Sequence, residues 1–313
     1  MVLATNVAET SLTVPGIRYV VDSGLARINR YSPRAKVEQL LIEKISQASA
    51  RQRAGRCGRV SSGICVRLYE ESDFNARPAF TDPEIVRSSL AAVILRMAAL
   101  KLGRVDEFPF LEAPSGKLVA DGYQQLRELG AVDDGDVLTP IGKQLARLPV
   151  DPKLGRMLLG GHQEHCLKEI LIIASAMSLQ DPRERPFEAR DAADRAHLRF
   201  ADDKSDFMSY LKVWAFFEEA QANKQSNRQL LNLCHQHFFL SYLRLREWRD
   251  LHRQLEDIVE DLEWRLNEKP GTYEQIHKAL LTGLLGNIGM KQPEADEYLA
   301  RAPSSSRFSL APA

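Results

Sequence analysis

The hydrophobic pattern of this chain changes near Asp82, and the change restricts the folds that the chain can adopt. Before Asp82, short β-branched runs such as Ile17 to Asp22 end at turn signals, and Ile64 to Tyr69 alternate apolar and polar side chains as a strand does. The runs 27–31 and 37–42 lie on either side of a short turn and predict a β-hairpin. After Asp82, apolar residues recur at helical spacing. The sequence therefore predicts an α/β part followed by a mainly α part.

Helix starts are marked at three places by a capping residue that is followed by proline. These places are Asp82-Pro83, Thr139-Pro140 and Asp151-Pro152. Between them, residues 117–129 predict a helix that ends at Gly130, and Val137-Leu138 predicts a short extended piece. This order of helices around a short strand is compatible with a small winged-helix unit.

The sequence beyond Asp151 predicts a largely helical part. Cys166 to Met177 is almost entirely apolar, so we expect a helix that is buried on every side. Asp181 to Asp206 is rich in charged residues and predicts a solvated loop region. Asn227 to Leu266 predicts one long helix, which a Pro-Gly pair ends. Beyond residue 272, a short helix to Leu285 is followed by extended, polar sequence.

The composition excludes several classes of protein. The 313 residues include 42 Lys plus Arg and 42 Asp plus Glu, and this net charge of zero excludes a uniformly basic nucleic-acid coat. No apolar stretch is long enough to cross a bilayer, which predicts no membrane association. The four cysteines form no CxxC pair, which argues against disulfide frameworks and zinc ribbons and favours a reducing cytoplasm.

Histidine and cysteine gather at residues 162–166 and 234–237, and aromatic residues gather at 214–217 and 238–239. The histidines and cysteines lack the usual spacing of metal ligands, so the sequence predicts no metal site. The aromatic residues lie at helical spacings, so we expect them in a core rather than on a base-stacking platform.

Both ends of the sequence lie within segments that are expected to be structured. Met1 to Ala4 lacks the features of a signal peptide and is typical of the middle of a buried strand. The other end stops within the extended segment near Arg307 to Leu310. We therefore expect the chain to be a fragment of a longer protein.

The most specific segment is Gln52 to Arg59, with the sequence QRAGRCGR. On a helix, Gln52, Arg56 and Arg59 share one face, whereas Arg53 points elsewhere. An amide and two guanidinium groups that project together suit a phosphate group. The two glycines weaken a helix and indicate that something approaches the backbone closely. From spacing alone, a solvated basic helix end explains the segment equally well.

A second segment, Ala4 to Thr13 (ATNVAETSLT), collects hydroxyl side chains and an asparagine at the end of the predicted first strand. A loop at this place can present hydrogen-bond donors to phosphate or sugar oxygens. Capping of a following helix accounts for the same residue types about as well.

The two segments, with Asp22 to Leu25 (DSGL) between them, resemble motifs V, Va and VI of the DEAH-box helicases of superfamily 2. Residues 29–50 are similar to that family's β-hairpin insertion, and the resemblance, to RNA helicases of the bacterial HrpA type, covers essentially the whole chain. It implies four regions. These are a partial second RecA-like domain with the β-hairpin (1–80), a winged helix (81–150), a helical ratchet-like domain (151–270), and a terminal helix with the beginning of an OB-fold (271–313).

The resemblance implies roles in nucleotide binding. Gln52 and Arg56 would contact the γ-phosphate of ATP, and Arg59 would act beside Arg56 as an arginine finger. Ser11 and Thr13 would lie near the nucleotide and couple its state to the grip on RNA. The implied cofactor is ATP with Mg²⁺, and the Mg²⁺ ligands are expected in a first RecA-like domain.

The resemblance also implies single-stranded or duplex RNA as the partner, with an association with the ribosome. The hairpin would be a wedge that separates strands or limits backward slippage. The residues expected to bind RNA are Thr5, Asn6, Arg30, Arg34 and Lys36. Charge supports this expectation, since residues 16–59 contain ten Lys or Arg and three Asp or Glu, a net charge of +7.

The implied activity is ATP hydrolysis coupled to 3′-to-5′ translocation along RNA and its unwinding, in the cytoplasm. The sequence contains neither a G-x-x-x-x-G-K-[ST] loop nor a DEAH motif. We therefore expect an N-terminal RecA-like domain to be missing, and the isolated chain to be inactive. The alternative is a non-catalytic RNA-binding or partner-binding module.

Overall fold

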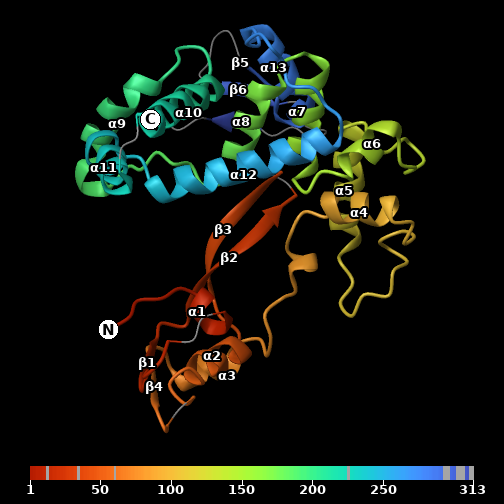
Figure 1. Cartoon of the computed structure of the whole chain (residues 1–313). Helices are drawn as coiled ribbons and strands as arrows, with labels where there is room; N and C mark the ends of the chain where they lie inside the picture. Colours follow the sequence, from red (N-terminus) through yellow and green to blue (C-terminus); the bar gives the residue numbers. More distant parts are fainter. Residues whose placement is uncertain are drawn as a thin grey trace. The chain divides into compact units, whose positions relative to one another are not determined.

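The computed structural model describes residues 1–11, 14–33, 36–59, 61–223, 226–291, 297–300 and 307–309. These residues form a mixed α/β structure in which helices predominate. The chain divides into two compact units, Met1–Gln124 (unit 1) and Gln125–Ala313 (unit 2), which are described in turn. Figure 1 labels the helices and strands in chain order.

Two pairs of strands organise unit 1. β1 (Tyr19–Asp22) lies parallel to β4 (Ile64–Arg67), whereas β2 (Leu25–Ser32) and β3 (Val37–Lys44) form an antiparallel hairpin. A parallel pair needs a long crossover connection, and here the hairpin and the following helix supply it. The strands and the hairpin that the sequence predicted are confirmed.

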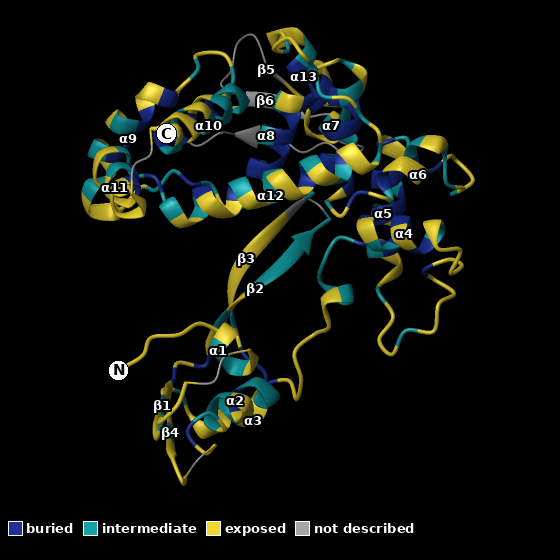
Figure 2. Cartoon of the chain, in the orientation of Figure 1, coloured by how far each residue is buried: buried dark blue, intermediate teal, exposed yellow. Residues whose placement is uncertain are grey.

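The helices of unit 1 are short except at its C-terminal end. They are α1 (Val7–Thr10), α2 (Gln47–Ala54), α3 (Glu71–Ala76), the 3₁₀ turn η1 (Glu84–Val86), α4 (Ala91–Ala99) and the first part of α5 (Gly116–Glu128). The buried residues of this unit concentrate in α4 and α5, whereas β1 and β4 are largely exposed (Figure 2). The helix predicted to end at Gly130 is confirmed as α5, and Gly130 has a φ of 69°.

Two expectations for unit 1 are wrong. The helix expected after Asp82 is only the turn η1, because the carboxylate of Asp82 accepts hydrogen bonds from Arg30 at 3.1 Å and caps nothing. Residues 1–5 form no strand, and Met1 and Leu3 are exposed. A strand requires backbone partners, and the hydrogen-bonded sheets of the described residues do not include this segment.

Unit 2 is a helical assembly that begins with the end of α5. Its further elements are α6 (Pro140–Leu145), α7 (Pro152–Gln163), α8 (Leu167–Met177), η2 (Phe187–Ala189), α9 (Arg190–His197), η3 (Leu198–Phe200), α10 (Asp206–Ala222), α11 (Asn227–Asn232), the π-helical turn η4 (Leu233–His237), α12 (Tyr242–Asp261), α13 (Tyr273–Gly283) and η5 (Leu285–Asn287). Thr139 and Asp151 cap α6 and α7 through their side chains, with oxygen–nitrogen distances of 3.0 and 2.8 Å. These two predicted helix starts are confirmed. A bridge between Val132 and Leu138 confirms the short extended piece.

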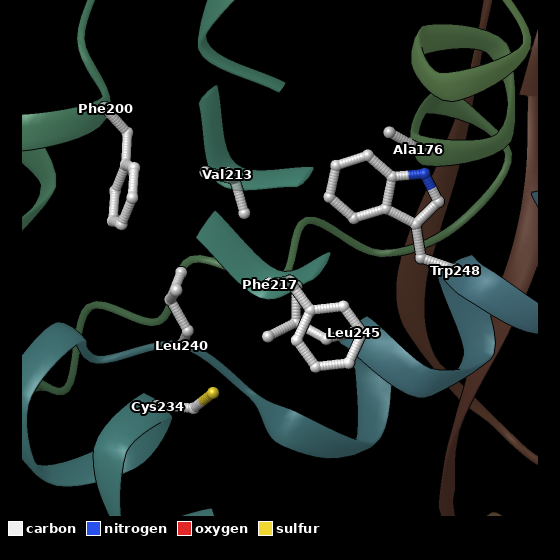
Figure 3. Packing of buried hydrophobic residues seen from close by; sticks show 8 residues of the cluster. All are labelled: Ala176, Phe200, Val213, Phe217, Cys234, Leu240, Leu245 and Trp248. Atoms are coloured by element: carbon white, nitrogen blue, oxygen red, sulfur yellow. The ribbon is translucent and has the colours of Figure 1, made fainter. Parts of the chain in front are cut away.

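The core of unit 2 lies between α8, α10 and α12. Figure 3 shows its buried side chains, which are Ala176, Phe200, Val213, Phe217, Cys234, Leu240, Leu245 and Trp248. Trp248 also donates its indole N–H to the carbonyl of Ile172 at 3.0 Å and to the hydroxyl of Ser175 at 2.9 Å. Trp214, Phe216 and Phe238 pack against this cluster. The prediction that these aromatic residues belong to a core is confirmed.

The long helix predicted from Asn227 to Leu266 is interrupted. Phe239 has a φ of 51°, its carbonyl accepts the amide of Glu184 at 2.8 Å, and Leu240 is fully buried. The chain bends here because a segment distant in sequence pairs with its backbone. The solvated loop expected at residues 181–206 is also wrong, because it contains α9, and its Phe200 is part of the core.

The last described residues form a small antiparallel sheet. Its strands are β5 (Gly289–Lys291), β6 (Glu297–Ala300) and β7 (Arg307–Ser309), in the order β5-β6-β7. The extended structure that the sequence predicted here is confirmed at these strands. The OB-fold stays a prediction. Across the described part of the chain, no helix combines the length and the apolar character needed to cross a membrane.

Candidate functional site

A cavity of about 820 Å³ in unit 1 collects the two segments that were most specific in the sequence. Thr5 and Asn6 line it beside α1, and β1, the start of β2 and the end of α2 contribute further walls. The charged residues that line it are Arg27, Arg53, Arg56, Arg59, Glu9 and Asp22. Because cations outnumber acids, the cavity suits an anionic ligand.

The arginines reach the cavity through a change of helix type. α2 begins at Gln47, where Ser46 accepts the amide of Ser49 at 3.2 Å, and it ends at Ala54. Beyond it, the amides of residues 56, 57 and 58 donate to carbonyls three residues earlier, at 3.0, 3.3 and 3.4 Å. Such turns have three residues each, so side chains three positions apart lie above one another. Arg53, Arg56 and Arg59 therefore all line the cavity.

This turn brings other side chains to the cavity than the helical face expected from the sequence, whereas the predicted roles of Gln52, Arg56 and Arg59 at a phosphate stay predictions. An α-helix over the whole segment would have placed Gln52 beside Arg56 and Arg59 and turned Arg53 away. In the structure Gln52 is exposed and does not line the cavity, whereas Arg53 does. The physical reason is the change of hydrogen bonding after α2, where the amides of residues 56, 57 and 58 donate to carbonyls three residues earlier. The spacing of the arginines, one every third residue, was the signal that could have revealed Arg53.

Two carboxylates hold the guanidinium of Arg53 in the cavity wall. Its guanidinium donates to the carboxylate of Glu9 at 3.0 Å and to that of Asp22 at 2.8 Å. Burial lowers the pKa of Arg53, but the hydrogen bonds to Asp22 and Glu9 outweigh it and raise the pKa above its ordinary value. Arg56 donates to the backbone carbonyl of Glu9. Glu9 therefore holds two of the three arginines.

Asp22 is buried at the end of β1 and joins four parts of unit 1. Besides Arg53, its carboxylate accepts the amide of Gly24 at 2.9 Å and the hydroxyl of Tyr69 at 3.0 Å. Burial and the hydrogen bond to Asp22 raise the pKa of Tyr69 to about 12. Asp22 also lines the cavity.

The other site residues predicted from the N-terminal segment have fewer contacts within the cavity wall, or do not line the cavity. Ser11 is exposed and does not line the cavity; the Oγ1 of Thr10 lies 3.4 Å from its Oγ. Thr13 lies outside the described residues. Thr5 lines the cavity, and its hydroxyl accepts the amide of Val7, the first residue of α1, at 3.4 Å.

Two of the cations predicted to bind RNA, Arg30 and Lys36, already have carboxylate partners. Arg30 pairs with Glu43 at 2.6 Å and with Asp82 at 3.1 Å, and Lys36 pairs with Asp121 at 2.7 Å. Arg34 lies outside the described residues. The acids at 82 and 121 are distant in sequence, so the local net charge of +7 overstates the positive charge of this surface.

Three family models match this chain. Residues 1–61 match the helicase conserved C-terminal domain, residues 122–150 match the winged-helix part of the helicase associated domain (HA2), and residues 151–210 match its ratchet-like part. Unit 1 thus carries the first match, with the complete cavity wall.

Curated relatives match the chain almost from end to end. ATP-dependent RNA helicase HrpA of Escherichia coli is 53% identical over 317 residues, which cover 100% of this chain and 24% of the relative. An HrpA homolog of Haemophilus influenzae is 53% identical over 96% of the chain and 23% of its own length. The DExH-box ATP-dependent RNA helicase DExH1 of Arabidopsis thaliana is 36% identical over 92% of the chain and 29% of its own length. The chain therefore spans about a quarter of the length of these relatives.

Proposed function

The chain belongs to the DEAH-box, HrpA-type family of ATP-dependent RNA helicases, and from this premise we propose that it supplies the arginine side of an ATP-hydrolysing site. One observation carries the proposal. A single cavity is lined by Arg56 and Arg59, which are proposed to bind phosphate, and by Thr5 and Asn6, which are proposed to bind RNA.

The chemistry assigned to this site is charge stabilisation. Arg56 and Arg59 would stabilise the negative charge that spreads over the transferred phosphoryl group, an effect worth about 10³–10⁵ in rate. Glu9 and Asp22 already accept hydrogen bonds from Arg53, so the acids of the cavity are engaged. This fits the expectation that Mg²⁺, which neutralises charge on the phosphates, is held by residues outside this chain.

Glu9 offers a route by which nucleotide and RNA are coupled. Its carboxylate holds Arg53 and its carbonyl holds Arg56, while Asn6 and Thr5 lie three and four residues before it in the chain. A shift of the arginines on the phosphate would therefore move the segment that grips RNA. Ser11 and Thr13, which follow Glu9, would take part in the same coupling.

The whole protein would translocate along single-stranded or duplex RNA in the 3′-to-5′ direction. In this proposal residues 1–80 are part of the second RecA-like domain, 81–150 the winged helix, 151–270 the ratchet-like domain, and 271–313 include the beginning of an OB-fold. Arg30, Arg34 and Lys36 would approach RNA from the hairpin. Arg30 and Lys36 would then exchange the carboxylates that they pair with in the structure for RNA phosphates. Association with the ribosome in the cytoplasm stays part of the proposal.

The test uses a full-length helicase in which this chain replaces the matching segment of the Escherichia coli relative. Arg56→Ala should lower RNA-stimulated phosphate release by about 10³-fold or more and change ATP and RNA affinity little, because the arginine acts on the transition state. The matched control is Arg18→Ala, which removes an exposed arginine of unit 1 that does not line the cavity. Near-normal turnover of the Arg56 variant would remove the arginine assignment.

The isolated chain provides the second arm of the test. It should release no phosphate from ATP, with or without RNA, because its sequence lacks the phosphate-cradling loop. RNA-stimulated turnover by the pure chain would contradict the proposal. RNA binding by the isolated chain, together with full turnover of the Arg56→Ala chimera, would instead favour the non-catalytic RNA-binding module.

A further inference from the structure

A second cavity lies entirely within unit 2, apart from the site described above. Its volume is about 340 Å³, at the small end of the range for ligand pockets. The C-terminal end of α5 forms one wall, α6 and α7 contribute one residue each, and α13 with η5 closes it. Its lining residues are Arg127, Glu128, Leu129, Gly130, Ile141, Arg156, Lys278, Leu281, Thr282 and Leu285.

Arg156, which lines this cavity, has a hydrogen-bond donor without a partner among the described residues. Its Nε donates to the carbonyl of Leu129 at 3.2 Å, but its Nη1 is buried and has no partner among the described residues. Burial lowers the pKa of Arg156, yet a guanidinium stays charged at neutral pH. A buried donor without a partner costs stability, so a ligand that accepts from it would remove a real penalty.

The charge around Arg156 is positive. Arg127 and Lys278 also line the cavity, against the single acid Glu128. Arg127 is already paired with the carboxylate of Asp136. The charge that a ligand would meet therefore comes mainly from Arg156, at the wall, and Lys278, which is exposed on α13.

The rest of the cavity is aliphatic. Leu129, Ile141, Leu281 and Leu285 line it, and Leu281 and Leu285 remain 45% and 38% exposed. A phosphate group offers nothing to such walls, because it is strongly hydrated and carries no apolar surface. A carboxylate joined to an aliphatic group satisfies both the guanidinium and the leucines.

We propose that this cavity binds the C-terminal leucine or isoleucine of a partner polypeptide, with its α-carboxylate on Arg156 and its side chain against the leucines. Arg156 is suited to this role because a guanidinium binds a carboxylate with two parallel hydrogen bonds. The site would let a partner dock on unit 2 without using the cavity of unit 1.

The probe for the test is N-acetyl-leucine, which has the carboxylate and the side chain of a peptide C-terminus. Methyl NMR of the full chain should show saturable shifts at Ile141 and Leu281. N-acetyl-leucinamide, the neutral counterpart, should bind about tenfold more weakly or not at all, and inorganic phosphate should leave these methyl groups unchanged. Arg156→Met should abolish the shifts.

A second variant tests the same cavity in case Arg156→Met does not fold. Leu285→Glu places an acid at the cavity wall on a partly exposed residue and should weaken binding of N-acetyl-leucine about tenfold. Leu243→Glu, at a residue that is 63% exposed on α12 and does not line the cavity, should leave binding unchanged. The proposal is overturned if no saturable shift occurs, if the amide binds as well as the acid, if phosphate shifts the same methyl groups, or if both cavity variants bind like the unaltered protein.

Discussion

Side chains around Asp22 show how unit 1 keeps its cavity in shape. Asp22 is buried, and the donors that surround its carboxylate come from α2, from the turn before β2 and from Tyr69, two residues after the end of β4. Arg77 is also buried, stacks on the ring of Tyr69 at 3.8 Å and donates to the carbonyl of Gly24 at 2.9 Å. Loss of one partner in such a buried network leaves another charge unpaired, which is costly.

Gly24 and Gly16 provide a matched test of this packing. Both have a left-handed φ, 72° and 74°, but a Cβ on Gly24 would lie 2.6 Å from the ring of Tyr69, whereas one on Gly16 would meet nothing within 4 Å. Gly16→Ala should cost about 1–2 kcal/mol from the backbone alone, and Gly24→Ala roughly 1–3 kcal/mol more from overpacking.

The measurement for the glycine pair is amide hydrogen exchange of peptides that cover β1 and β2. Tryptophan fluorescence would not serve, because Trp214, Trp248 and Trp264 all belong to unit 2. Equal destabilisation by the two substitutions would mean that Tyr69 does not press on Gly24 as the structure shows.

Among the elements, α8, α10 and α12 are joined by an aromatic cluster. Trp248 of α12 reaches α8 through two hydrogen bonds, and its ring lies 5.1 Å from that of Trp214 on α10. The ring of His252, one turn after Trp248, lies 4.5 Å from the ring of Trp214. A titratable side chain thus lies within the contact between two helices.

His252 should make unit 2 sensitive to acid. Burial lowers its pKa to about 4, and the nearest carboxylate, Glu256, is 3.9 Å from its Nδ1. Because the unfolded chain binds a proton below pH 6.5 and the folded chain does not, stability is complete above pH 6.5 and declines as the pH falls to 4. The loss should reach about 3 kcal/mol at pH 4, from 1.36 kcal/mol per unit of pKa.

Urea unfolding followed by tryptophan fluorescence checks this prediction, since Trp214 contacts His252 directly. His252→Leu removes the titration, so the variant should lose less stability than the unaltered protein between pH 6.5 and pH 4. Part of the slope should persist, because burial also lowers the pKa of His162. The same slope in both proteins would show that His252 is not responsible.

For the whole molecule, the net charge of the chain and the local charge of residues 16–59 lead to different expectations about RNA binding. The chain is neutral overall, while residues 16–59 carry ten cations and three acids. Among the described residues of this segment, four of those cations pair with carboxylates, at distances between 2.6 and 3.1 Å. They are Arg30, Lys36, Lys44 and Arg53. At most six of the ten then remain for phosphate contacts without the loss of an ion pair.

The salt dependence of RNA binding should reflect this pairing. For single-stranded RNA, the slope of log K against log salt concentration should be no steeper than about −4, from 0.7 per contacted phosphate. Arg27→Gln removes a cation that lines the cavity and should reduce the slope by about 0.7, whereas Lys44→Gln, whose amine is paired with Asp73, should not. Fluorescence anisotropy over a salt series measures both. A slope near −7 would mean that RNA displaces the ion pairs.

The sequence by itself determined the local elements and the chemistry that they carry. Strand alternation, the capping residues Thr139 and Asp151, and the stop at Gly130 act within a few residues, so they can be recognised without a fold. The sequence also predicted phosphate binding by the arginines of residues 52–59, and it contains no G-x-x-x-x-G-K-[ST] loop.

Only the tertiary structure decided which side chains meet. Arg53 rather than Gln52 lines the cavity because 3₁₀-type turns follow α2 and because Glu9 and Asp22, distant in sequence, hold the guanidinium. Asp82 pairs with the hairpin instead of starting a helix, and α12 is separated from α11 because the amide of Glu184 donates to the carbonyl of Phe239. Contacts between residues far apart in the chain outweigh local preferences of about 1 kcal/mol, and no local pattern records them.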